Sequence, residues 1–238
     1  WRDRLAWVGL AAAPSSLMMG VTTYLSTDVA SAPFLWVAPL ALYLLTFIIA
    51  FQIKPVIGRN LTLTLQAAAV AACAYMLPFD VNDVLLQIVV HLVSFFLTAL
   101  VCHQALVARR PPPAQLTEFY LWMSVGGVIG GAFNAFLAPV IFTTVIEYPL
   151  VLVLAVFARP WGPRTLPLWR WLLLVLGIAT AVAAAIAVNF LGPFMVVKTM
   201  LAVTLLIAFV LRANSFVFAG RVLEFVRTRE MAAYVRKA

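Results

Sequence analysis

The sequence predicts an all-α fold: a polytopic integral membrane protein with about eight transmembrane helices, both termini on the inner side and a short amphipathic C-terminal tail. Three observations predict it. First, 65% of the 238 residues are hydrophobic and only 10% are charged, whereas soluble domains average about 45–50% apolar and about 25% charged residues. Second, the apolar residues form runs of membrane-spanning length. Third, the basic residues fall between alternate runs, on one side only.

Eight apolar segments approach the length of about 20 helical residues that a hydrocarbon core requires. They cover residues 5–27, 34–53, 61–79, 84–106, 117–138, 142–158, 169–190 and 194–212. Prolines mark most of the breaks, since proline lacks the N–H group and clashes with the preceding turn. The segments predict a transmembrane domain over residues 1–213 and a cytoplasmic amphipathic tail or linker over 214–238.

Charge predicts the orientation. Fifteen of the sixteen basic residues fall before the first segment or after the second, fourth, sixth and eighth, and the exception is Lys198, inside the last segment. Because basic residues concentrate in cytoplasmic loops, both termini are predicted to be cytoplasmic. Arg110 and Arg159 should share a side, so the apolar stretch between them should cross twice. Tyr24 and Tyr148 are expected at the outer interface.

The tail mixes apolar and basic residues at helical spacing. This pattern is typical of an amphipathic helix that lies on anionic lipid, and a solvated linker is the equal alternative. The formal net charge of +8 is spread between apolar runs. Its role is therefore topological, and a nucleic-acid partner is not expected.

Two glycine pairs interrupt the stretch "LTEFYLWMSVGGVIGGAFNAFLAP", residues 116–139. They form two overlapping GxxxG patterns: Gly126, Gly127, Gly130 and Gly131. Residues four apart share a helix face, and glycine lets another backbone approach closely. The Gly126–Gly131 face is predicted to pack against other membrane helices or subunits. Alternatively, it lets the helix slide or hinge in a transport cycle.

An inner pair is predicted at the fourth hairpin. His103 and Glu118 end and begin neighbouring segments joined by a short loop. Their contact would be either a proton-coupled site, because histidine titrates near neutral pH, or an interfacial ion pair. His91 lies about 18 Å along the helix from His103 and about 120° around it, which excludes a metal site shared by the two histidines.

A polar outer cluster is the third candidate. It comprises Asp28, Asn134, Glu147 and Lys198. Charges within a span usually face protein or a water-filled cavity, so the cluster could form a vestibule for a small polar or cationic solute. The alternative is that nearby hydroxyls bond their own helix and the acids are solvated. Lys198 either pairs with one of the acids or extends to the headgroups.

Catalytic motifs are missing from the sequence: it contains no GxGxxG, P-loop, HExxH or GxSxG pattern. Its two cysteines, Cys73 and Cys102, have no metal-ligand spacing and are expected to be small buried residues. No catalytic residue, cofactor or metal is therefore predicted, and the chain is not expected to be an enzyme.

Several motifs in order resemble one family. They are "PSSLMMGVTTYLSTDVASAPFLWVAPLALYLLTFIIAF", "CHQAL", "LTEFYLWMSVGGVIGGAFNAFLAP" and "IEYPLVLVLA". They resemble the membrane region of bacterial spermidine-synthase-like proteins, a major-facilitator-like membrane part fused to an aminopropyltransferase-like domain. The resemblance covers about residues 5–158 and implies a multi-pass protein of the bacterial inner (cytoplasmic) membrane. This chain has Ala105 where the family motif usually carries an acid, and it lacks the synthase-like domain, so no synthase residue can be assigned.

Two functions of different class follow. The chain is expected either to bind or move a small polar metabolite, polyamine-like by family analogy, or to act as a non-catalytic scaffold. A scaffold subunit would pack in a larger membrane complex or anchor a synthase-like partner. The two differ in one observable property, because a transporter needs a polar pocket that solvent can reach.

Overall fold

The computed structural model describes residues 1–29, 35–53, 56–76, 83–142, 147–156 and 158–159. Its elements are α1 (Arg2–Tyr24), η1 (Leu25–Val29), α2 (Val37–Phe51), α3 (Arg59–Met76), α4 (Val84–Val107), η2 (Pro113–Gln115), α5 (Leu116–Ala132), η3 (Phe133–Leu137), α6 (Ala138–Ile141) and α7 (Glu147–Val156). All of these are helical, and no strand occurs among the described residues. The first six predicted segments coincide with helices. The seventh and eighth segments and the tail lie outside the described residues.

Among the described residues, three continuous helical stretches are long and apolar enough to cross a membrane. They are Arg2–Thr27, Val84–Val107 and Pro113–Ile141, and the shorter α2 is also apolar. Each stretch exceeds the length of about 20 residues that a bilayer core demands. By length and composition, the chain therefore has the character of a membrane protein.

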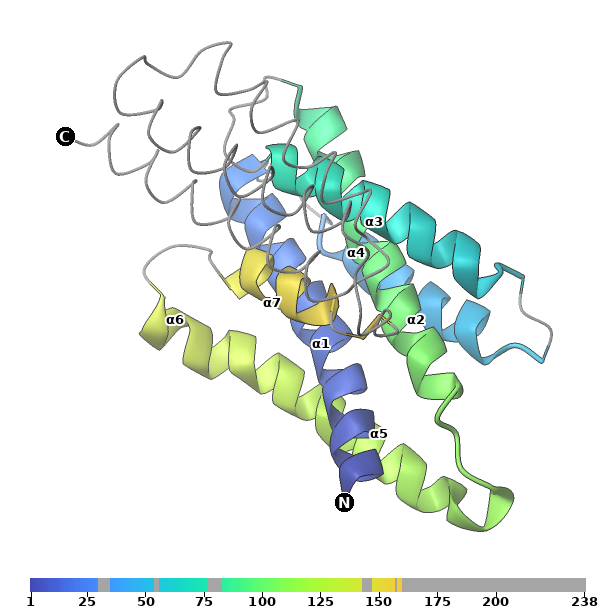
Figure 1. Cartoon of the computed structure of the whole chain (residues 1–238). Coiled ribbons are helices and arrows are strands. Elements are labelled where there is room, and N and C mark those ends of the chain that lie inside the picture. Colours follow the sequence, from blue (N-terminus) through green and yellow to red (C-terminus); the bar gives the residue numbers. More distant parts are fainter. Residues whose placement is uncertain (30–34, 54–55, 77–82, 143–146, 157, 160–238) are drawn as a thin grey trace, which may run out of the picture.

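α1 is the central helix of the described bundle. It contacts α2, α4, α5 and α7, most extensively α5, while α2 and α3 both pack on α4 (Figure 1). Its buried residues include small ones such as Ala11, Ser15 and Gly20. Small side chains on several faces allow one helix to have several close neighbours.

α4 begins at a side-chain cap. The carboxylate of Asp83 accepts a hydrogen bond of 3.0 Å from the backbone N–H of Leu86. Aspartate is a preferred N-cap residue because it satisfies an otherwise unpaired N–H group of the first turn. The cap explains why the helix starts at Val84, as the apolar pattern predicts.

Pro139 lies in the predicted break between the segments 117–138 and 142–158. This break is wrong, because the helix continues to Ile141. The preceding five residues form the π-turn η3, in which the Ala138 N–H donates to the Phe133 carbonyl, five residues back. A π-turn already departs from the i to i−4 hydrogen-bond ladder that proline disrupts. The proline is accommodated in this loosened turn.

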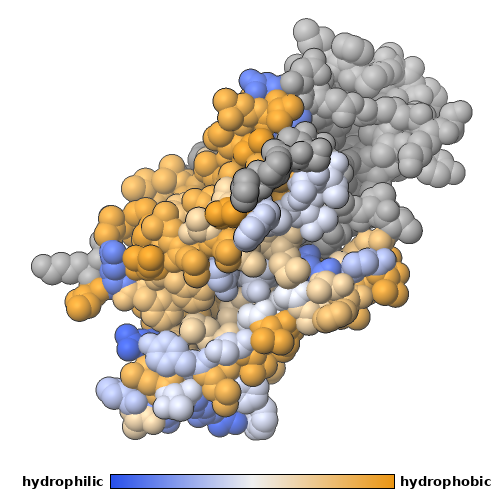
Figure 2. Space-filling view, turned by 180° about the vertical axis from the view of Figure 1, so that it is seen from behind, coloured by the Kyte–Doolittle hydropathy of each residue, from blue (hydrophilic) through white to orange (hydrophobic). Residues whose placement is uncertain are grey.

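The core lies between α1, α3, α4 and α7. Leu17, Phe95 and Leu152 are among its fully buried side chains. Large apolar side chains are also exposed on the outside, for example Ile48 on α2 and Val140 on α6. Figure 2 shows hydrophobic residues over most of the described surface on one face. Such a surface is typical of helices that face lipid or other helices.

Candidate functional site

An open pocket of about 590 Å³ lies where the beginning of α1 meets the ends of α4 and α7. Its walls carry small side chains, including Ala6, Gly9 and Ala13 of α1 and Ala155 at the end of α7. Because these residues project little, the helices leave space between them. The volume falls within the range of about 300–1,000 Å³ typical of small-molecule sites.

Three arginines line this pocket, from three separate segments. Arg59 begins α3, Arg109 follows α4 and Arg159 follows α7, and none of the described lining residues is acidic. Arg59 and Arg109 are exposed, whereas Arg159 is 5% exposed. We call this site the arginine pocket. Its charge favours anions, because low-dielectric walls strengthen the field of the three cations.

Arg159 is held in place by uncharged groups of α3. Its Nη1 atom donates to the Leu63 carbonyl at 2.9 Å and to Gln66 Oε1 at 2.6 Å. The amide of Gln66 in turn donates to Thr98 on α4, at 3.5 Å. These bonds orient the guanidinium group.

The segment after α4 is tied to α1. The indole N–H of Trp7 donates to the Arg109 carbonyl at 3.1 Å, and the Trp7 ring packs edge-on against Phe119 at 5.3 Å between centroids. This contact holds Arg109 beside the first turns of α1. It gives the arginine pocket a fixed wall.

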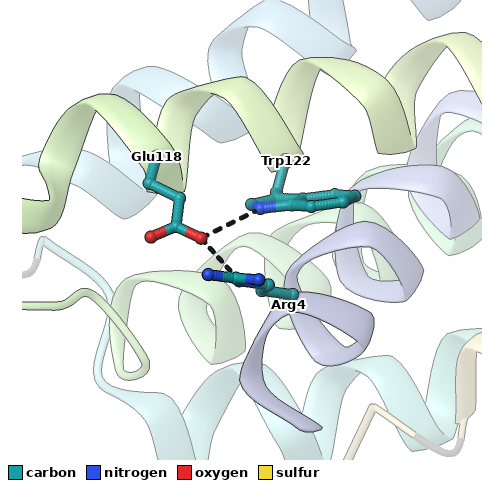
Figure 3. A network of polar contacts seen from close by, with 3 residues as sticks. All are labelled: Arg4, Glu118 and Trp122. Carbon is teal, nitrogen blue, oxygen red and sulfur yellow. Dashed lines mark hydrogen bonds and ion pairs between the residues drawn. The ribbon is translucent and has the colours of Figure 1, made fainter. Parts of the chain in front are cut away.

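The predicted pairing of His103 with Glu118 is not the one in the structure. Glu118 forms an ion pair of 2.5 Å with Arg4 and accepts a hydrogen bond of 3.3 Å from the indole of Trp122 (Figure 3). Arg4 also lies over the ring of Trp1, 5.1 Å from its centroid. This site joins the beginnings of α1 and α5.

His103 instead faces α2. It is fully buried, with Nδ1 2.9 Å from the Thr46 hydroxyl and its ring 3.8 Å from the Phe47 ring. Because the Thr46 hydroxyl donates to the Tyr43 carbonyl at 2.6 Å, His103 Nδ1 is the donor in their bond. The two ends of the hairpin therefore face different helices: His103 lies against α2, and Glu118 lies against Arg4 of α1.

The outer cluster is described only in part. Asn134 donates to the Ser16 carbonyl of α1 at 3.0 Å and to the Gly130 carbonyl at 3.3 Å, so its amide is used in helix packing. The described part of the structure includes neither the side chains of Asp28 and Glu147 nor any of Lys198. The vestibule and the pairing of Lys198 therefore stay predictions.

The hydroxyls near the outer end of α1 bond to their own helix. Thr22 donates to the Met18 carbonyl at 2.7 Å and Thr27 to the Thr23 carbonyl at 2.8 Å. Ser26 bonds the Thr22 carbonyl in the same way. These bonds agree with the alternative prediction for the outer cluster, in which nearby hydroxyls bond their own helix.

The structure contains a buried polar cluster that the sequence did not predict. Cys73 Sγ lies 3.2 Å from His91 Nδ1 and 3.5 Å from the Tyr148 hydroxyl, which is 3.1 Å from His91 Nδ1. The Tyr24 ring packs on both aromatic rings, at 4.5 and 5.5 Å between centroids. Tyr24 and Tyr148 are both buried in protein, and their position at the outer interface stays a prediction.

No sequence signal could have found this cluster, because its members come from α1, α3, α4 and α7. Within the described part of the chain, no three His, Cys, Asp or Glu residues are placed to hold a metal ion.

The four glycines of α5 separate into two kinds. A Cβ added at Gly126 would lie 2.5 Å from the Val8 carbonyl oxygen, and one at Gly130 would lie even closer to the Ala12 carbonyl oxygen. A Cβ at Gly127 would meet nothing within 4 Å, and one at Gly131 would make only ordinary contacts. The closest approach to α1 therefore uses one pair, not a strip of four.

Comparisons with family models, curated proteins and solved structures found no match. Function is therefore inferred from the residues and their geometry.

Proposed function

We propose that this chain is an integral membrane module of a spermidine-synthase-like protein, and that it binds or moves a small polar solute at the arginine pocket. One observation carries the proposal: an open pocket of about 590 Å³ with three arginines at its wall. A helix bundle that only scaffolds has no need of an open space lined by cations.

The charge of the pocket also bears on the solute. A polyamine is a polycation, and like charges repel when few opposite charges intervene. The three arginines therefore argue against a polyamine at this site, although the family resemblance suggests one. An uncharged or negatively charged solute suits the pocket better.

The proposal includes eight spans, cytoplasmic termini and the bacterial inner membrane. It is supported by the position of Arg59, Arg109 and Arg159 around one pocket, as loops on the same side require. Cysteines introduced at Asp83 and at Pro112 test it in intact cells. A membrane-impermeant thiol reagent should label Asp83→Cys from outside and should not reach Pro112→Cys. Labelling of Pro112→Cys from outside would overturn the orientation.

Solute binding is tested by a variant that fills the pocket. Gly9 lines it, and a Cβ added there meets nothing within 4 Å, so Gly9→Phe should fold while occupying the cavity. Gly127→Phe is the matched control, since Gly127 is equally open and does not line the pocket. The full chain is purified gently and denatured, and the released small molecules are identified by mass spectrometry.

We expect one solute to accompany the parent and Gly127→Phe in near-stoichiometric amount and to be depleted in Gly9→Phe. Equal amounts in all three proteins, or no solute in any, would contradict binding at the arginine pocket.

The scaffold function has its own supporting observation. The outer face of α5, η3 and α6 exposes large apolar side chains: Val128 is 71% exposed, Phe136 74% and Val140 83%. Lipid or another membrane helix would cover this face. A photo-crosslinker placed at Val128 in native membranes separates the two cases. A single discrete protein adduct would favour the scaffold, whereas adducts with lipid alone would leave only the binding function.

A further inference from the structure

We infer that the ligand of the arginine pocket carries a phosphate group, from either a soluble organic phosphate or a phospholipid headgroup. The inference rests on the proposed function, because it names the chemical class that the same pocket takes.

The first step is charge. Arg59, Arg109 and Arg159 contribute three positive charges to one pocket, and no described residue of its wall is acidic. No ion pair among the described residues engages Arg59 or Arg109. A ligand that carries negative charge would therefore be attracted to these arginines.

The partial charges of the helix ends do not reverse the positive charge of the arginine pocket. α3 starts at the pocket, whereas α4 and α7 end there. A helix end carries a partial charge of about half a unit, positive at the start and negative at the end. The full charges of Arg59 and Arg109 already exceed these partial charges, so the pocket stays attractive to anions.

The second step is shape. A guanidinium group is a planar fork of donors that matches phosphate and carboxylate oxygens in pairs. A carboxylate has two oxygens, whereas a phosphate group offers up to four, arranged tetrahedrally. Three arginines that converge from three segments suit the larger set of acceptors. The bonds from Arg159 to Leu63 and Gln66 fix the direction of one fork before any ligand binds.

The third step is access. The pocket is open, and small side chains of α1 and α7 form its walls. A soluble phosphate ester can enter from water. Basic pockets between membrane helices also bind phospholipid headgroups. Both sources offer the same phosphate chemistry, so the experiment carries one arm for each.

The experiment measures binding to the full chain in detergent. The probes are glycerol phosphate, a soluble ester, and dioctanoyl phosphatidate, a short-chain lipid with the same headgroup. Dissociation constants are obtained from the ligand dependence of the melting temperature and by calorimetry. The variants are Arg59→Gln and Arg109→Gln, which are exposed and should fold. Arg110→Gln is the matched control, because Arg110 is the exposed neighbour of Arg109 and does not line the pocket.

We expect saturable binding of at least one probe to the parent. Arg59→Gln and Arg109→Gln should each weaken it by roughly tenfold or more, as expected for the loss of a charged hydrogen-bond donor. Arg110→Gln should stay within about twofold of the parent, because an exposed charge outside the site is screened. Binding of phosphatidate alone identifies a lipid ligand, and binding of glycerol phosphate identifies a soluble one.

The inference is overturned if neither probe binds saturably, or if Arg110→Gln weakens binding as much as the two pocket variants. It also fails if the pocket variants bind like the parent. These failures differ from failure of the proposed function. A solute without phosphate that accompanies the parent and is lost from Gly9→Phe would support the binding function and contradict a phosphate ligand.

Discussion

On α5, Gly126 and its neighbour Gly127 lie in opposite surroundings. Gly126 and Gly130 are buried against α1, where an added Cβ would meet a carbonyl oxygen. Gly127 has open space in the direction of a side chain. Successive residues of a helix turn by about 100°, so a shift of one position leads from contact to open space. A GxxxG pattern thus predicts a close-packed face, and the partner helix decides which pair forms it.

The contacts that α1 makes determine which glycines of α5 pack closely. The glycines meet the backbone of α1 at Val8 and Ala12, and the Ser15 hydroxyl donates to the Gly127 carbonyl at 2.9 Å. Close backbones and interhelical hydrogen bonds are the forces that hold helices together in lipid, where the hydrophobic effect between helices is absent. Substitutions on each face of α5 test this difference in packing.

The largest effect is expected at Gly130. In Gly130→Leu, the side chain would occupy the space of the Ala12 carbonyl, so α1 and α5 must separate. Overpacking of this kind destabilises by about 3 kcal/mol or more when the backbone is the obstacle. Thermal unfolding of the purified variant should show a large drop in melting temperature or loss of the folded protein. A variant that melts with the parent would mean that the two helices do not meet here.

The helices themselves were largely predictable. α4 spans Val84–Val107, against an expected span over 84–106, because apolar length and the acidic cap are both local properties of the sequence. The continuation through Pro139 was not predictable, since it depends on the π-turn before it. Proline usually ends or kinks a helix, but a neighbouring irregular turn can allow the helix to continue.

The site was predictable only in its charge. Loop parity placed Arg59, Arg109 and Arg159 on one side, but their convergence depends on how α1, α4 and α7 pack. The expected contact between His103 and Glu118 failed for the same reason, because each end of the hairpin met a different helix. Contacts across the bundle depend on rotation of each helix about its axis, which hydropathy does not fix.

A moderate effect is expected at Asn134, which lies in η3, directly after α5, and contacts α1. Its amide donates to the Ser16 carbonyl and to the Ser16 hydroxyl. Asn134→Ala should lower the free energy of unfolding by about 1 kcal/mol, within the range measured for hydrogen bonds between membrane helices. Chemical unfolding in mixed micelles checks the value.

Ser16→Ala provides the matched comparison for that bond. It removes only the hydroxyl and keeps the carbonyl acceptor, so its effect should be smaller than that of Asn134→Ala. Equal effects would mean that the hydroxyl carries the interaction.

A smaller effect is expected at Arg4, where α1 and α5 begin. Arg4 and Glu118 form an ion pair whose side chains are 37% and 36% exposed. Solvent screens such pairs, so Arg4→Gln should destabilise by about 0.5 kcal/mol and the difference should shrink in high salt. Arg2→Gln is the control, because Arg2 is also exposed and forms no ion pair among the described residues. A loss above about 2 kcal/mol would show that the pair is shielded from solvent.

The smallest effect is expected at Gly127. The side chain of Gly127→Leu would point into open space, and the bond from Ser15 would persist because it uses the backbone carbonyl. Glycine is less favourable than alanine in a helix by about 0.8–1 kcal/mol in water and leucine ranks next to alanine, so the change should be neutral or slightly stabilising. The melting temperatures of Gly127→Leu and Gly130→Leu, measured side by side, then compare the two faces directly. If both variants lose stability equally in the purified protein, the outer face of α5 is as closely packed as the inner one. If Gly127→Leu is silent after purification and disruptive only in native membranes, another helix covers that face there, and the scaffold function gains support.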